Sequence, residues 1–133
     1  MIYVKAVIKG EDDIPPFTRL FEYPDKSDEL IFFNVIKMIK EKLSKNLKIN
    51  VNECLMIYCV YIIEQLHTNK SIKSIEENAI KVLSVNQVMI GVPESLKKIT
   101  FEVKIHEDKN VRKQIVNINQ PLPINRYILA DDY

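Results

Sequence analysis

The residues best suited to metal binding or acid–base catalysis are the two histidines, His67 and His106. A zinc site needs several His or Cys ligands, commonly at short spacings along the chain. His67 and His106 fall in different predicted elements, and neither belongs to a spaced ligand motif. We expect His67 in the last turn of a helix, where a cation complements the helix dipole, and His106 in a solvated turn. The histidine pattern therefore predicts no metal site.

The two cysteines, Cys54 and Cys59, have a spacing that suits neither redox chemistry nor metal binding. They are five residues apart, which separates them by about 140° around a helix. That spacing differs from the C-x-x-C of a redox pair and from the spacing of two ligands on one helix face. We expect both to be buried, inert thiols.

Other chemistry-bearing patterns have structural explanations. Residues 11–13 and 131–132 are acidic but lack the spaced ligands of a calcium site, so we expect them to be solvated. The chain has only two glycines, which excludes a glycine-rich phosphate-binding loop. Ser71 and Ser84 precede helical patterns and suit helix capping. We therefore expect no catalytic, cofactor-binding or metal-binding residue on this chain.

Length and charge narrow the class of protein. The chain has 133 residues, and we expect a single domain over residues 1–133. Its 19 Lys and Arg nearly balance its 18 Asp and Glu, and this net charge of +1 argues against binding to nucleic acid or to a membrane surface. The longest apolar run, residues 54–63, has ten residues, whereas a membrane-spanning helix needs about 20. Without a signal-peptide pattern or a disulfide framework, we expect a cytoplasmic protein.

The first part of the chain predicts two strands and a helix. Residues 2–8 and 17–23 are rich in β-branched and aromatic residues, and Gly10 and a proline pair separate them. Pro24 opens a helix that ends near Asn46, a residue that tolerates the left-handed C-cap conformation. The face of this helix that we expect to be buried carries Leu30, Phe33, Ile36, Ile39 and Leu43.

A second helix has the clearest boundaries. Asn50 and Glu53 have the spacing of a capping box, in which each side chain bonds to the backbone N–H of the other residue. This predicts a helix over residues 51–68, with Asn69 as its left-handed stop.

This second helix is apolar on all sides, since residues 55–63 include no charged residue. Such a helix is buried most of the way round. In a small domain that requires a central position or a partner chain that covers it. We expect Tyr58 and Tyr61 to contact such a partner.

The rest of the chain predicts a third helix and a hairpin. Ser71 caps a helix over residues 72–83, with Ile80 among its inward residues, and a second capping box opens a single-turn helix that ends at Gly91. Residues 100–105 and 114–119 alternate as strands, and the polar residues 106–113 form the turn between them. The prediction is an α+β fold: three helices, a one-turn helix, and a small antiparallel sheet formed by the C-terminal hairpin and the N-terminal strand.

Four short segments follow one another between Pro24 and Leu122. They are Asn46-Leu47-Lys48-Ile49-Asn50-Val51-Asn52-Glu53, Asn69-Lys70-Ser71-Ile72, Asn86-Gln87-Val88-Met89-Ile90-Gly91-Val92-Pro93-Glu94 and Val116-Asn117-Ile118-Asn119-Gln120-Pro121-Leu122. They are similar to G-L-K-L-N-Y-P-E, G-K-T-V, D-Q-V-M-x-G-V-P-E and V-T-V-H-N-P-I of the urease gamma subunit family. The chain therefore resembles this family. The motif positions that we single out are Asn46, Asn50, Glu53, Asn69, Gln87, Val88, Met89, Gly91, Val92, Pro93 and Pro121.

The resemblance implies a non-catalytic subunit of a nickel urease. Members of the family assemble with alpha and beta subunits as a trimer of αβγ units. Urea is hydrolysed to ammonia and carbamate on the alpha subunit, where His, Asp and a carbamylated Lys hold two nickel ions. None of these ligands is expected on the gamma chain, so we expect no cofactor here.

The ends of the chain depart from the family pattern. We expect residues 1–22 to form an N-terminal strand extension, residues 24–122 the urease-gamma-like region, and residues 123–133 a C-terminal tail. An added strand is a ready way to form a homo-oligomer through its edge. The alternative function is therefore a stand-alone domain that associates with itself or with an unrelated partner and has no enzymatic role.

Overall fold

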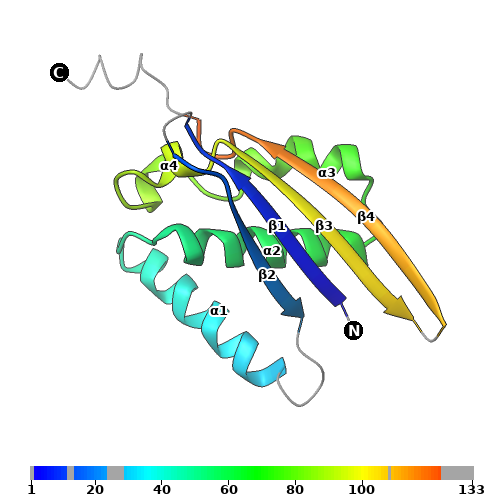
Figure 1. Ribbon diagram of the computed structural model, residues 1–133. Coiled ribbons are helices and arrows are strands. Elements are labelled where there is room, and N and C mark those ends of the chain that lie inside the picture. Colours follow the sequence, from blue (N-terminus) through cyan, green and yellow to red (C-terminus); the bar gives the residue numbers. More distant parts are fainter. Residues whose placement is uncertain (1, 12–13, 24–28, 108, 124–133) are drawn as a thin grey trace.

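The computed structural model has a four-stranded antiparallel sheet with helices packed on one of its faces (Figure 1). The structure describes residues 2–11, 14–23, 29–107 and 109–123. This architecture confirms the predicted α+β fold. In chain order the elements are β1 (Ile2–Lys9), β2 (Phe17–Tyr23), α1 (Glu29–Ser44), α2 (Val51–His67), α3 (Ile72–Asn78), the 3-10 turns η1 (Ala79–Lys81) and η2 (Val85–Gln87), α4 (Val92–Ser95), β3 (Lys98–Glu107) and β4 (Asn110–Asn119).

The N-terminal strand β1 lies inside the sheet. The strand order is β2-β1-β3-β4, and every neighbouring pair is antiparallel. The register places Val4 of β1 between Phe21 of β2 and Val103 of β3. Because successive side chains on a strand point to opposite faces, this register gathers the apolar residues of the strands on one face. Strands β2 and β4 form the two edges.

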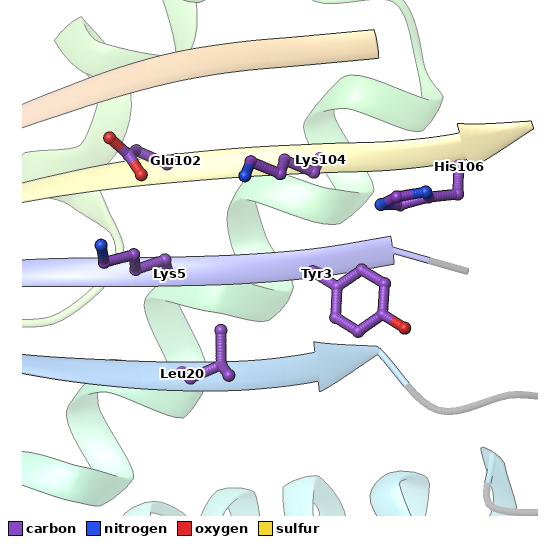
Figure 2. Close-up of a pocket in the computed structure, with 6 residues that line it drawn as sticks. All are labelled: Tyr3, Lys5, Leu20, Glu102, Lys104 and His106. Atoms are coloured by element: carbon purple, nitrogen blue, oxygen red, sulfur yellow. The ribbon is translucent and has the colours of Figure 1, made fainter. Parts of the chain in front are cut away.

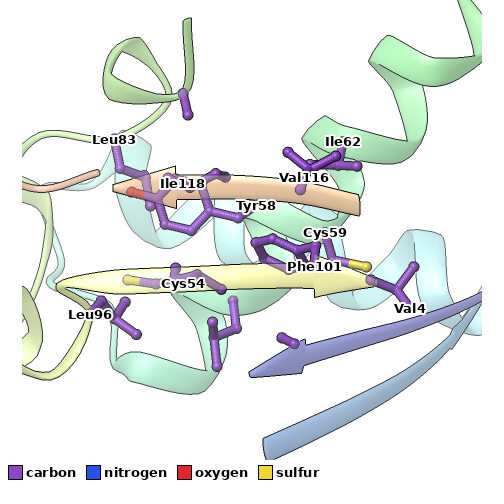
Figure 3. Close-up of a cluster of buried hydrophobic side chains, with 14 of the residues drawn as sticks. Val4, Cys54, Tyr58, Cys59, Ile62, Leu83, Leu96, Phe101, Val116 and Ile118 are labelled. Atoms are coloured by element: carbon purple, nitrogen blue, oxygen red, sulfur yellow. The ribbon is translucent and has the colours of Figure 1, made fainter. Parts of the chain in front are cut away.

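The apolar face of the sheet and helix α2 form the core (Figure 3). Val4, Ala6 and Ile8 of β1 are fully buried, and so is Phe101 of β3. Helix α2 therefore obtains much of its burial from a central position inside this chain. Its buried residues are Cys54, Leu55, Tyr58, Cys59, Ile62 and Ile63.

Local signals in the sequence set the ends of the helices. The Glu53 N–H donates to Asn50 Oδ1 at 2.9 Å, and the Asn50 N–H donates to Glu53 Oε1 at 3.1 Å. These two bonds confirm the predicted capping box of α2. Asn46 follows α1 and Asn69 follows α2, each with a φ of 59°, as predicted for left-handed helix stops.

Gly10 joins the end of β1 to helix α4. A Cβ atom at Gly10 would lie 3.0 Å from the Glu94 carbonyl oxygen and 3.2 Å from Ser95 Cα, so this close approach favours glycine. The Glu11 N–H donates to the same Glu94 oxygen at 3.0 Å. The N-terminal strand is thus tied to the rest of the fold at its end as well as along the sheet.

Three predicted boundaries are wrong. The third helix ends at Asn78, whose side chain donates to the Ser74 carbonyl at 2.9 Å and competes with the backbone, and η1 follows. Gly91 ends no helix; with a φ of 92° it is the N-cap residue before α4, where Pro93 suits the first turn. The hairpin strands extend to Glu107 and from Asn110, because the exposed residues predicted as a turn continue the pairing of β3 with β4 beyond the core. The predicted helix start at residues 24–28 and the tail at 125–133 lie outside the described residues.

Candidate assembly surface

Helix α1 has one buried side, and it exposes large apolar side chains on its other sides. Ile36 and Ile39 are buried, whereas Phe33 is 64% exposed and Met38 is 62% exposed. The prediction that Phe33 is buried is wrong: in the described part of α1 the buried core residues are Ile36 and Ile39, with Val35 and Leu43 packed against the core. Phe33 lies two helical turns before Lys40 and so on the same stripe of α1.

A groove of about 270 Å³ lies between α1 and α2. Its α2 wall consists of Ile57, Val60, Tyr61 and Glu64, which have the i, i+3, i+4, i+7 spacing of a single helix stripe. The sequence contains this stripe, but the uniform apolarity of α2 hides it, because every side of the helix looks buried. The other lining residues are Ile36, Lys40 and Leu43 of α1, and Val82 and Leu83 after η1.

Tyr61 is a fixed part of the groove wall. Its hydroxyl donates to the Ile75 carbonyl at 2.8 Å, and burial raises the pKa of the phenol. Lys40 and Glu64 bring charges of both signs to an otherwise apolar lining. An apolar centre with a polar rim is typical of protein–protein contacts, so this groove suits apolar side chains of another protein.

Ile80 adds a further exposed apolar side chain next to the groove-lining segment. It is 51% exposed, although the sequence predicts that it faces inward. The prediction is wrong because the third helix changes to the tighter turn η1 at Ala79, and this change rotates Ile80 off the helical stripe.

Tyr58 is buried inside the chain itself and does not contact a partner from the surface. Its exposed fraction is 0%, and Figure 3 shows its ring among core residues of the sheet. Its hydroxyl has no hydrogen-bond partner within the described residues, and burial raises the pKa of the phenol. The expectation that Tyr58 contacts a partner is therefore corrected, because the apolar side of α2 that carries it faces the sheet.

The motif around Gly91 connects helix α2 to strand β3. The Met89 N–H donates to the Ile49 carbonyl at 2.9 Å, and Val88 forms a parallel β-bridge with Ile49, directly before α2. Gln87 Oε1 accepts from the Ser84 N–H at 2.8 Å. The motif positions thus support the packing of the fold, and Val92, Pro93 and Pro121 are buried.

The cysteines are buried and chemically quiet, as expected. Burial raises the pKa of Cys54 to about 12, with the neighbouring Glu53 charge adding to the effect, and burial alone raises that of Cys59 to about 12. Both are free thiols and stay protonated at neutral pH.

The histidines lie on different elements and line different hollows. His67 is in the last turn of α2, as predicted, but His106 lies on β3 and not in a turn. Its ring packs edge-on against Tyr3, with centroids 5.2 Å apart. Across residues 2–11, 14–23, 29–107 and 109–123, no three His, Cys, Asp or Glu residues form a group that could hold a metal ion. In the described part of the chain, no helix has the length and apolarity to cross a membrane.

The sheet face opposite the helices forms a second hollow of about 300 Å³ (Figure 2). Its lining mixes basic, acidic, aromatic and aliphatic side chains. Figure 2 shows them rising from three neighbouring strands, and no described helix covers this face in Figure 1. The lining residues are Tyr3, Lys5, Leu20, Glu102, Lys104 and His106.

A family model and three relatives indicate the same family. The sequence model of the family described as "Urease, gamma subunit" matches residues 21–122. A urease subunit gamma from Halalkalibacterium halodurans is 28% identical over 99 residues, which cover 74% of this chain and 95% of the relative. Those from Prochlorococcus marinus strains AS9601 and MIT 9301 are each 25% identical over 99 residues, with the same coverage. Residues 1–20, which include all of β1, precede the family match.

Proposed function

Because the chain belongs to the urease gamma subunit family, we propose that it is the non-catalytic small subunit of a nickel-dependent urease. In this role it supports assembly of the complex that hydrolyses urea to ammonia and carbamate. The observation that carries the proposal is the family match over residues 21–122. The 95% coverage of the Halalkalibacterium halodurans relative supports it, because nearly the whole of that gamma subunit has a counterpart here.

The partners in this proposal are urease alpha and beta subunits, arranged as a trimer of αβγ units in the cytoplasm. The nickel ions belong to the alpha subunit, where they polarise urea and activate water. This chain carries no cofactor in the proposal and binds neither nucleic acid nor membrane. The net charge of +1 supports that assignment.

We assign the groove between α1 and α2 as a contact with the large urease subunit. The support is chemical, since the lining is mainly apolar, Tyr61 is fixed by its bond to Ile75, and Phe33 extends the same stripe into solvent. Burying the exposed part of Phe33, whose exposed fraction is 64%, would stabilise the complex by about 1–2 kcal/mol.

The proposal gives the motif residues a supporting role. Asn46, Asn50, Glu53 and Asn69 set the helix ends, and residues 87–93 hold α2 against the sheet. We propose that residues 24–122 form the urease-gamma-like region, with residues 1–22 and 123–133 as additions to it.

A specific observation favours the alternative, a self-associating domain without enzymatic role. Strand β1 precedes the family match, yet it lies inside the sheet and contributes fully buried residues. An addition so closely built into the fold changes the surface that this chain offers to partners.

Co-purification of groove variants tests the assembly role. The tagged full-length chain, expressed in its source cells, is expected to recover a large nickel-containing chain. Phe33→Glu places a charge beside the groove and should reduce that recovery at least about tenfold, whereas its stability should change little because Phe33 is already 64% exposed.

Met38→Glu is the matched control, because it puts the same charge on the same helix at a position that is 62% exposed and lies on another side. Equal recovery of the large nickel-containing chain by the unaltered chain and by both variants would contradict the assignment of the groove. Recovery of this chain alone, free of metal, would support the alternative function.

A further inference from the structure

Strand β2 is an edge strand whose outer side meets no other strand in the described part of the chain. It pairs with β1 along its whole length, from Ile8↔Phe17 to Ile2↔Tyr23. The alternate N–H and C=O groups on its other side are therefore oriented to accept a further strand. Figure 1 shows β2 at one margin of the sheet.

The opposite edge, strand β4, has features that oppose strand addition. The Asn117 N–H donates to Glu76 Oε2 of α3 at 2.6 Å, so an α3 side chain occupies part of that edge. Arg112 and Lys113 place positive charge on the same strand. Side chains that bond to edge groups and charges along the edge are common protections against strand pairing.

Strand β2 has fewer of these protections. Between Pro16 and Pro24 it holds neither lysine nor proline, and its one basic residue, Arg19, is turned toward the helices. Arg19 Nε donates to Asn52 Oδ1 at 3.3 Å, and the guanidinium carbon lies 5.2 Å from the centroid of the Phe17 ring. On the other face of the strand, Leu20 is 65% exposed.

We propose that β2 pairs antiparallel with β2 of a second copy of this chain, around a two-fold axis at Leu20. A two-fold axis perpendicular to the sheet keeps the helices of both copies on one face and joins the two sheets into one. It sets Leu20 opposite Leu20, so that two exposed leucines cover each other on the open face.

The charge of the strand fits a second copy. Residues 17–23 contain one Arg and one Glu, so the paired strands of two copies carry no net charge. The same axis places Thr18 opposite Glu22 and Arg19 opposite Phe21, and no two like charges lie directly opposite each other. Much of this surface comes from residues before the family match, so the proposal goes beyond the urease-subunit role.

Sedimentation of the isolated full-length chain tests the proposal. The unaltered chain should be a dimer. Leu20→Lys sets two lysines opposite each other at the axis and should raise the dissociation constant of the dimer at least about tenfold, while the circular dichroism spectrum of the chain stays unchanged. Val111→Lys is the matched control, because Val111 is 57% exposed on the other edge strand, and it should leave the dimer intact.

Oxidative crosslinking tests the register. Leu20→Cys should form a disulfide between copies, because directly opposite residues have Cβ atoms about 4.5–5.5 Å apart. Thr18→Cys should not, since its opposite residue is Glu22. The natural cysteines are buried and should not interfere.

A monomer at all concentrations, a dimer that Leu20→Lys leaves unchanged, or equal crosslinking at both positions would overturn the proposal. None of these results depends on urease partners, so the dimer and the proposed function can fail separately.

Discussion

The Tyr58 hydroxyl is a polar group enclosed by the apolar core. It is buried in an apolar site without a hydrogen-bond partner among the described residues. An unsatisfied buried polar group costs about 1–3 kcal/mol, so this hydroxyl contributes nothing to stability that the ring alone would not. The sequence shows only that Tyr58 lies on an apolar helix. It cannot show which side of that helix faces the sheet.

Tyr58→Phe should therefore raise the free energy of unfolding by about 1 kcal/mol, because it removes the hydroxyl and keeps the ring. Tyr58→Asp should unfold the chain, because it buries a charge without a partner. Urea denaturation followed by circular dichroism measures both. A loss of more than about 1 kcal/mol in Tyr58→Phe would mean that the hydroxyl has a stabilising partner after all.

Glu53 is a residue whose charge stabilises the fold. Burial acts to raise its pKa, but the bonds from Lys42 Nζ at 2.9 Å and from the Asn50 N–H outweigh burial, and the pKa lies below its ordinary value of 4.5. A carboxylate with a lowered pKa stabilises the folded state above the pKa of the unfolded chain. This contribution is lost as the pH falls through the lowered pKa of the folded state.

Glu53→Gln should keep the hydrogen bond from the Asn50 N–H to the side chain at position 53, but it should lose the ion pair with Lys42. We expect a loss of about 0.5–1 kcal/mol at pH 7 that shrinks as the pH falls below 4.5. Denaturation at pH 7 and pH 3 measures the difference. A loss that is equal at both pH values would contradict the role of the charge.

At the scale of elements, signals confined to a few residues were predictable and signals that depend on packing were not. The capping box at Asn50 and the left-handed stops at Asn46 and Asn69 are local, and they place the helix ends correctly. The N-terminal strand was predicted to join the sheet, but its position between β2 and β3 depends on long-range pairing, which local sequence patterns do not reveal. The exposure of Phe33 and Ile80 likewise depends on where neighbouring elements end.

The role of β1 as an inner strand can be tested with two neighbouring residues. Ala6→Glu puts a charge into a fully buried position and should abolish cooperative folding. Lys5→Gln, on the solvent-facing side of the same strand, should change stability by no more than about 0.5 kcal/mol. Thermal melting of both variants tests whether β1 contributes to the core. A folded Ala6→Glu variant would contradict the placement of β1 in the core.

At the scale of the whole molecule, the chain combines a complete small core with apolar side chains that remain exposed. The core explains how the chain folds, and the groove between α1 and α2 with Phe33 beside it offers a surface to a partner. In the described ranges, no three His, Cys, Asp or Glu residues lie together in a group that could hold a metal ion. Family membership, together with this surface, supports a role in assembly.

The urease-subunit role can be tested by native purification of the chain from its source cells, followed by nickel analysis and a urea hydrolysis assay. This role predicts recovery of a complex with a large nickel-containing chain that releases ammonia from urea. A purified chain that brings no large subunit, contains no nickel and releases no ammonia would contradict it.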